Sequence, residues 1–416
     1  MRYAVLLLSV LFVTSGLNVC LAQEWTRFRG LHGQGQSRAD RIPVKWSQDQ
    51  VAWKTRLPGV GHSSPVIWGD KVFVTCWDRD SQQGILTALN CDNGTVLWEK
   101  RYTLGENKLH TLNNNAVATP AVDERYVYVL WLSSDQMQMA ALTHQGEEVW
   151  KQSYGPVYSN HGFGTSPILY KDKLIIAQEQ RENDQGLESR WMAVDKATGQ
   201  IQWELKRSNA KLSYMTPCLF TDETGSDQLI FTSLVHGVTA VDPKEGKVLW
   251  EIADIFDGRT IGSPVFVDGC IVATCGAGGG GTVMVVIKPG SRTTQAELMH
   301  KIKNRFIPFI PSGIAVKDRL FTFHDQGTIA CWNVRQGQML WSERYRDKFY
   351  GSPVAVDDRL YCISAKGDVV VIRAGDRYEL MAVNPLGEES QATPAISENR
   401  LYLRTLTFLT CIADPQ

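Results

Sequence analysis

Hydrophobic and polar positions form a block of short runs that returns along this chain. Residues 216–252 illustrate the block: apolar runs at 217–220, 228–234, 238–241 and 247–252 are separated by turns rich in Asp, Gly, Ser and Pro. Runs of this length with turn residues between them predict four short strands in one antiparallel meander. We therefore expect four-stranded sheets along the chain.

Each block opens with Ser-Pro, Thr-Pro or a variant of them. A recurrence every 40–55 residues or so is typical of a repeat architecture. Four-stranded sheets that stack radially cover each other's faces and leave few open edges. We therefore predict an all-β, eight-bladed β-propeller. The eight openings are Ser64-Pro65, Thr119-Pro120, Ser166-Pro167, Thr216-Pro217, Ser263-Pro264, the degenerate Ser312-Gly313, Ser352-Pro353 and Thr393-Pro394.

The second half of the block carries a phrase in which Gly precedes Trp by four positions. Gly supplies the positive φ that the turn requires, and Trp follows on the fourth strand. We expect each Trp to wedge between neighbouring sheets as a structural residue, since burying an indole removes about 200 Å² of surface. The repeats that begin at Ser263 and Ser352 lack the phrase, and we expect both sheets to form with looser packing. The pairs are Gly94 and Trp98, Gly146 and Trp150, Gly199 and Trp203, Gly246 and Trp250, and Gly337 and Trp341.

The two ends of the chain complement each other. The last repeat predicts strands near residues 400–404 and 407–412 and then stops without a fourth strand. Residues 51–54 read as an orphan fourth strand, similar to residues 248–251. We predict that this N-terminal strand completes the last blade, with Trp53 in the same sheet as Leu401 and Phe408.

The first residues have the pattern of an export signal. Arg2 precedes an apolar stretch from Ala4 to Leu17, and Cys20-Leu21-Ala22 offers small residues for cleavage after Ala22. Lipid attachment at Cys20 is the alternative, although Val19 fits a lipoprotein signal poorly. The stretch is short for a membrane span, and no other segment could cross a bilayer. We predict a signal peptide at 1–22, an N-terminal extension at 23–50, the propeller at 51–416, and a periplasmic or secreted location.

Charge and cysteine content narrow the function classes. The formal net charge is −1 and no basic stripe appears, so a nucleic-acid partner has little electrostatic support. The nine Cys show no C-x-x-C, no adjacent pair and no zinc spacing. We expect buried thiols, with one or two disulfides as an alternative in an exported protein. We also expect a monomer.

The repeated phrase A-[LV]-[DN]-x-x-x-G-x-x-x-W and the Ser-Pro openings resemble the quinoprotein-type, or pyrroloquinoline quinone (PQQ)-like, propeller repeat. The resemblance covers about residues 51 to 414. The segment Trp25-Thr26-Arg27-Phe28-Arg29-Gly30 is similar to the start of secreted PQQ-like repeat proteins of Planctomycetes. Relatives include quinoprotein dehydrogenases, the propeller lipoprotein of the outer-membrane β-barrel assembly machinery, and sensor domains fused to bacterial Ser/Thr kinases. The repeat is specific for fold and weak for activity.

The resemblance implies two main functions. A quinoprotein dehydrogenase would hold PQQ between an adjacent Cys-Cys disulfide and a Trp, with Ca²⁺ on Glu, Asn and Asp. This chain has no adjacent Cys pair, no stretch onto which the calcium ligands map and no c-type haem motif. We therefore expect an exported, non-enzymatic propeller that acts as a binding or protein-interaction scaffold in the cell envelope. A dehydrogenase of alcohols or sugars, with PQQ and calcium as cofactors, is the alternative, and a purely structural envelope protein is a third class.

In a propeller, the turn before each first strand and the turn between the second and third strands open on one face around the central channel. Polar residues that converge at such a concave mouth can bind a ligand. Water in the funnel and the polar ends of the strands explain the same residues without a ligand. A metal is disfavoured because the His residues come from different blades. We predict a channel-mouth site for an envelope protein, a small molecule or a glycan, with no catalytic residue assigned. Its candidate residues are His62, Asn115, His161, Tyr214, Arg259, Arg305, Tyr350, Gln391, Asp78, His236 and His324.

The glycine-rich segment at residues 276–281 matches the G-x-G-x-x-G dinucleotide-binding motif in its residue types alone. That fingerprint requires a following helix whose N-terminus meets the pyrophosphate. Residues 282–287 are instead β-branched and strand-like. We predict a hairpin turn here.

Overall fold

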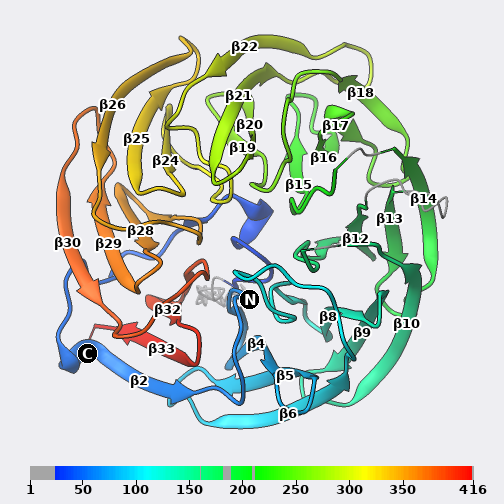
Figure 1. The fold of residues 1–416 in the computed structure, drawn as a ribbon, viewed down its shortest axis with the longest axis vertical. Helices are drawn as coiled ribbons and strands as arrows, with labels where there is room; N and C mark the ends of the chain where they lie inside the picture. The colour runs from blue at the N-terminus through cyan, green and yellow to red at the C-terminus, as the bar shows by residue number, and fades with distance from the viewer. Residues whose placement is uncertain (1–23, 160, 181–188, 209–210, 415–416) are drawn as a thin grey trace, which may run out of the picture.

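The computed structural model describes residues 24–159, 161–180, 189–208 and 211–414, so the predicted cleavage segment at 1–22 lies outside the described residues. Figure 1 shows the sheets arranged like spokes around a central axis, with one strand of each at the rim. The described residues form eight sheets, and the four strands of every blade form an antiparallel meander. The predicted eight-bladed, all-β propeller is confirmed.

The first four blades follow the chain in order. Blade 1 contains β3 (Val66–Trp68), β4 (Lys71–Asp78), β5 (Gln83–Asn90) and β6 (Val96–Thr103). Blade 2 contains β7 (Ala121–Val122), β8 (Tyr126–Ser133), β9 (Gln136–Thr143) and β10 (Glu148–Pro156). Blade 3 contains β11 (Ile168–Tyr170), β12 (Lys173–Gln178), β13 (Ser189–Asp195) and β14 (Ile201–Arg207). Blade 4 contains β15 (Cys218–Thr221), β16 (Asp227–Ser233), β17 (Gly237–Val241) and β18 (Val248–Ile252).

The last four blades continue the order until the final one borrows a strand. Blade 5 contains β19 (Val265–Val267), β20 (Cys270–Ala277), β21 (Gly280–Lys288) and β22 (Glu297–Lys303). Blade 6 contains β23 (Ile314–Val316), β24 (Arg319–Phe323), β25 (Thr328–Asn333) and β26 (Gln338–Arg344). Blade 7 contains β27 (Val354–Val356), β28 (Arg359–Ile363), β29 (Asp368–Arg373) and β30 (Leu380–Pro385). Blade 8 contains β31 (Ala395–Ser397), β32 (Arg400–Arg404), β33 (Phe408–Ala413) and β2 (Val51–Arg56).

Two local predictions are confirmed at the level of strands. Residues 216–252 form the four strands of blade 4 with boundaries within a residue or so of those expected. The glycine-rich segment is the hairpin between β20 and β21, and Gly278 and Gly279 take positive φ values of 64° and 91° there.

Blade 8 is completed by the N-terminal strand, as predicted. β2 pairs antiparallel with β33, and Trp53 lies opposite Cys411. Leu401 on β32 and Phe408 on β33 belong to the same sheet. Figure 1 shows blue β2 at the rim beside red β33, so backbone hydrogen bonds between the two chain ends close the ring.

Neighbouring blades are joined by what we call tryptophan docks, in which an indole of one blade packs on the glycine turn of the next. Trp150 shows the arrangement: its Nε1 donates to the carbonyl oxygen of Lys196 at 3.1 Å. A Cβ on Gly199, whose φ is +73°, would lie 2.7 Å from a ring carbon of Trp150. Glycine is therefore required both for the turn and for the close approach. The same dock joins Trp53 to the turn of Gly94, Trp98 to that of Gly146, and Trp203 to that of Gly246.

The two repeats without the phrase form complete sheets, and blade 5 makes other contacts with its neighbours. Trp250, 2% exposed, donates to the side-chain oxygen of Gln228 at 2.8 Å, and the amide nitrogen of Gln228 donates to Gly290 of blade 5 at 3.0 Å. On the other side of blade 5, the ring of His300 takes the place of an indole beside Gly337. Looser packing of blades 5 and 7 stays a prediction.

The Ser-Pro and Thr-Pro openings form a hydroxyl ring around the channel. Thr119 shows the pattern, since its Oγ1 accepts from the backbone N–H of Ser64 and its own N–H donates to Ser166 at 2.9 Å each. The recurring hydroxyl is thus explained by a backbone donor that needs a partner. Equivalent bonds run from Ser166 to Thr216, Ser263 to Ser312, Ser312 to Ser352, Ser352 to Thr393 and Thr393 to Ser64.

Residues 24–37, which we call the plug, cross the channel just past the hydroxyl ring. The plug contains the 3₁₀ helix η1 (Leu31–Gly33) and β1 (Gln36–Ser37), which pairs parallel with β27 (Figure 1, dark blue). The sequence placed an extension at 23–50 but gave no indication of this position. A second 3₁₀ helix, η2 (Gln48–Gln50), precedes β2. Backbone or side-chain hydrogen bonds from the plug reach Ile67, Val122, Pro217, Phe266, Gly313, Ala315 and Ala355 on or beside six first strands.

Each of the eight Cys in the described residues is a buried free thiol, as expected. In the part of the chain that the structure describes, no helix is long and apolar enough to span a bilayer.

Candidate functional site

The channel opens into a pocket of about 640 Å³ on the side of the turns that precede the first strands. Seven residues of the hydroxyl ring line its neck. Phe28 of the plug also lines it and, lying past the ring, forms its floor. The pocket therefore opens on one side of the propeller, because the plug lies in the channel on the other side.

Six of the eleven predicted residues line this pocket together. They come from the turns before the first strands of blades 1, 3, 4, 5, 7 and 8, in agreement with the reasoning from propeller geometry. The six are His62, His161, Tyr214, Arg259, Tyr350 and Gln391.

The other five predicted residues lie outside the lining and make contacts of their own. Asn115 accepts from the side chain of Asn107 at 3.1 Å, and His324 Nδ1 accepts from the backbone N–H of Gln326 at 2.9 Å. Asp78 accepts from the hydroxyl of Ser81 at 2.7 Å. Arg305 is exposed, and its guanidinium lies 4.8 Å from the ring centre of Phe306. His236 belongs to a network of hydrogen bonds and ion pairs between blades 3 and 4.

Sequence reasoning missed several residues of the lining. His110 stacks on His161 with ring centres 5.5 Å apart and an interplanar angle of 11°. Lys348 and Phe309 also line the pocket. Lys348 precedes Tyr350 by two positions, so its place in the same turn was a usable signal. Phe28 carried no such signal, because the sequence does not place the plug in the channel.

Arg259 and Lys348 give the pocket positive charge. Neither forms an ion pair with a carboxylate of the described chain. Asp325 is the acidic residue of the lining, but its carboxylate accepts from the backbone N–H groups of Phe309 and Ile310 at 2.6 and 2.9 Å. Burial raises the pKa of Asp325 despite these bonds. The lining therefore favours an anionic ligand.

Two of the pocket histidines are held in the neutral form. Burial lowers the pKa of His62 to about 3, and the positive charge of Arg404 acts in the same direction. Burial, Arg259 and His110 lower the pKa of His161. The Nδ1 atoms of His62 and His161 are buried and have no hydrogen-bond partner within the described residues. Neither ring therefore adds positive charge to the pocket near pH 7.

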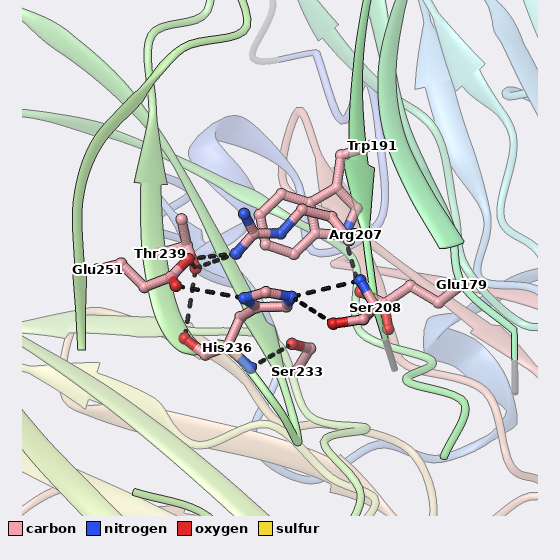
Figure 2. A network of polar contacts seen from close by, with 8 residues as sticks. All are labelled: Glu179, Trp191, Arg207, Ser208, Ser233, His236, Thr239 and Glu251. Carbon is pink, nitrogen blue, oxygen red and sulfur yellow. Dashed lines mark hydrogen bonds and ion pairs between the residues drawn. The ribbon is translucent and has the colours of Figure 1, made fainter. Parts of the chain in front are cut away.

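His236 lies in a network that ties blade 3 to blade 4 (Figure 2). The guanidinium of Arg207, from blade 3, pairs with Glu251 of blade 4 and lies 4.5 Å from the ring centre of Trp191. His236 Nδ1 is 3.2 Å from the Glu251 carboxylate, and its Nε2 is 3.3 Å from the hydroxyl of Ser208. Burial alone would raise the pKa of Glu251, but Arg207 and its other partners hold that pKa below its usual range. We assign the network to the contact between blades.

The pocket does not fit the calcium that the resemblance implies. Quinoprotein calcium needs several oxygen ligands that converge on one point. Across residues 24–159, 161–180, 189–208 and 211–414, no group of three or more His, Cys, Asp or Glu side chains could hold a metal ion. The cations of the pocket, Arg259 and Lys348, could hold carboxylates.

Comparison with known proteins places the chain in a family. A family model described as outer membrane protein assembly factor BamB matches residues 82–308 and 307–406, which is most of the chain. The chain belongs to the BamB-like family of PQQ-type propellers. Among curated proteins, none matches it in sequence. The resemblance to the PQQ-like repeat is thereby confirmed, whereas a planctomycete origin stays a prediction.

Solved structures similar to this BamB-family chain include a BamB and proteins named as dehydrogenases. BamB from Moraxella catarrhalis is 15% identical with a TM-score of 0.59, over 87% of this chain and 97% of its own. Quinohemoprotein alcohol dehydrogenase from Comamonas testosteroni is 14% identical with a TM-score of 0.69, over 95% of this chain and 81% of its own. A europium-containing methanol dehydrogenase is 13% identical with a TM-score of 0.67, over 91% of this chain and 89% of its own. At these identities the likeness shows the fold alone.

Proposed function

We propose that this BamB-family propeller is an exported, non-enzymatic binding protein of the cell envelope, and that its channel-mouth pocket holds a small aromatic carboxylate. The observation that carries the proposal is the pair of cations in the lining, Arg259 and Lys348, which have no carboxylate partner in the described chain. A charge-assisted hydrogen bond from a guanidinium to a carboxylate is about twice as strong as a neutral one.

The remaining lining supports an aromatic ligand over an aliphatic one. Phe28 forms the floor, and Tyr214 and Tyr350 come from the turns before blades 4 and 7. Aromatic side chains favour offset or edge contacts with another ring. A volume of about 640 Å³ lies within the usual range for small-molecule sites.

The proposal is tested with a charged probe and its uncharged analogue. Benzene-1,3,5-tricarboxylate should raise the melting temperature of the mature protein, whereas 1,3,5-benzenetrimethanol, with the same ring and no charge, should leave it unchanged. Equal shifts for both compounds, or no shift for either, would count against an anion-selective pocket.

Dehydrogenation of alcohols or sugars with PQQ and calcium is the second candidate, and the fold shared with alcohol dehydrogenases favours it. The poor fit of the pocket to calcium argues against it. We expect no dye reduction when PQQ, Ca²⁺ and an alcohol or glucose are added together. Reduction that depends on all three would replace the binding proposal with the enzyme.

The proposal also includes export with cleavage of a signal peptide and a protein partner in the envelope, and each can be tested. Cleavage after Ala22 would leave Gln23 as the first residue, directly before the plug. Mass spectrometry of the protein from an envelope fraction should show that N-terminus, and a lipid attached at Cys20 would correct it. Cross-linking in the envelope should retain a protein partner if the propeller also acts as a scaffold.

A further inference from the structure

Two arginines of the plug lie inside the channel, on either side of Phe28 in the sequence. Arg27 is 4% exposed and Arg29 is fully buried. Arg27 Nη2 donates to the carbonyl oxygen of Pro217 at 2.8 Å, and Arg29 Nη2 donates to that of Gly313. The Nε of Arg27 and the Nε and Nη1 of Arg29 are buried and have no partner among the residues that the structure describes.

Among the residues that the structure describes, no carboxylate forms an ion pair with either guanidinium. After burial, the thiol of Cys218 has the largest effect on the pKa of each guanidinium, and the charge of Arg27 and the thiol of Cys362 also act on Arg29. Burial raises the pKa of the Cys218 thiol even though both arginines lower it, so the thiol stays neutral near pH 7. Burial and the charge of Arg27 lower the pKa of Arg29 to about 10, which leaves it protonated near pH 7.

Two buried cations with unsatisfied N–H groups, one of which repels the other, are highly unfavourable, because a buried charge requires a counter-charge or full hydrogen bonding. We propose that a small monovalent anion of the halide class, chloride in the cell, is bound between Arg27 and Arg29 beside Cys218. Its charge would offset the repulsion of the two guanidiniums, and the three unpartnered N–H groups would bind it. The anion would fasten the plug to the first strands of blades 4 and 6.

Arg404 provides a matched contrast in the same protein. It is also fully buried, but its Nη1 donates to Ser63 and its Nη2 to the thiol of Cys76 at 3.8 Å. A single nitrogen, Nε, lacks a partner within the described chain, and no second arginine acts on it. We therefore expect no anion at Arg404.

Bromide soaking of crystals of the mature protein tests the site directly. Anomalous scattering should show a bromide between Arg27 and Arg29 and none at Arg404. Water at that position, or bromide at surface positions only, would overturn the proposal. The test does not involve the carboxylate pocket, so its failure would leave the proposed function standing, and the reverse also holds.

Melting temperatures give a second readout in solution. At equal ionic strength, the wild type should melt several degrees higher in sodium chloride than in sodium gluconate. Arg29→Gln should lose most of that difference, while Arg404→Gln should keep it. An equal difference in Arg29→Gln would assign the effect to general salt behaviour and contradict the site. If Arg29→Gln does not fold, the bromide experiment on the wild type decides alone.

Discussion

The indole of Trp150 in blade 2 lies on Gly199 in blade 3, and its Nε1 donates to the carbonyl oxygen of Lys196. This one contact joins two features of the repeat phrase, the glycine turn and the tryptophan four residues later, across a blade boundary. The phrase recurs because each blade supplies the turn for one neighbour and the indole for the other.

Replacing the glycine of this dock should cost more stability than replacing a glycine of equal backbone conformation elsewhere. Gly225 has a φ of +78° and open space within 4 Å of the position that a Cβ would take, whereas a Cβ at Gly199 would clash with Trp150. Gly225→Ala should cost about 1–2 kcal/mol from backbone strain alone, and Gly199→Ala about 1–3 kcal/mol more from the clash. Denaturant unfolding measures both, and equal losses would contradict the dock.

The closure of the ring can be tested with a disulfide between the chain ends. Lys54 on β2 lies directly opposite Thr410 on β33. Lys54→Cys combined with Thr410→Cys should form a cross-link under oxidising conditions and stabilise the fold by up to about 4–6 kcal/mol, since it closes a very long loop. Non-reducing electrophoresis and unfolding with and without reductant measure the effect. Lys54→Cys alone is the control, and failure of the pair to cross-link would place the two strands apart.

The hydroxyl ring predicts unequal effects of two similar substitutions. Thr119 Oγ1 accepts from the buried backbone N–H of Ser64, whereas Ser263 Oγ is buried without a partner in the described chain. Thr119→Val keeps the shape but leaves that N–H unsatisfied, which should cost about 1–3 kcal/mol. Ser263→Ala should be nearly neutral. A larger loss for Ser263→Ala in denaturant unfolding would show that the ring bonds are unimportant.

The buried pocket histidine predicts a dependence of stability on pH. The pKa of His62 is about 3 in the folded protein, below the value of about 6.5 that an unfolded histidine has. Between these values the unfolded state binds the extra proton, so His62 lowers the unfolding free energy as pH falls from 6.5 towards 3. The slope contributed is at most about 1.4 kcal/mol per pH unit. His62→Gln should flatten the curve over this window, and an unchanged slope would show that His62 is not held neutral.

The architecture was readable from the sequence because its determinants are local. In five repeats the glycine and the tryptophan of the phrase sit four residues apart in the chain, and the missing fourth strand of the last repeat matched residues 51–54. The plug was not readable. Its hydrogen bond from Arg29 to Gly313 spans 284 positions, and no periodic pattern links these residues.

The site was predictable only as far as turns determine it. Position in a turn before a first strand was enough to place Tyr214 and Arg259 at the mouth. The position in a turn does not predict that the side chain of Asn115 accepts a hydrogen bond from Asn107, or that His236 lies beside the carboxylate of Glu251. Those orientations depend on contacts with other turns and other blades, which the repeat does not encode.

The central claim is that an unpaired cation in the channel mouth binds a carboxylate. Titration calorimetry with benzene-1,3,5-tricarboxylate on the wild type, Arg259→Gln and Arg305→Gln tests it most directly. Arg305 is exposed and lies outside the pocket lining, so it serves as the control for charge. The account predicts saturable binding by the wild type, a loss of about tenfold or more in Arg259→Gln, and little change in Arg305→Gln. Equal affinity in all three proteins, or no binding by the wild type, would contradict it.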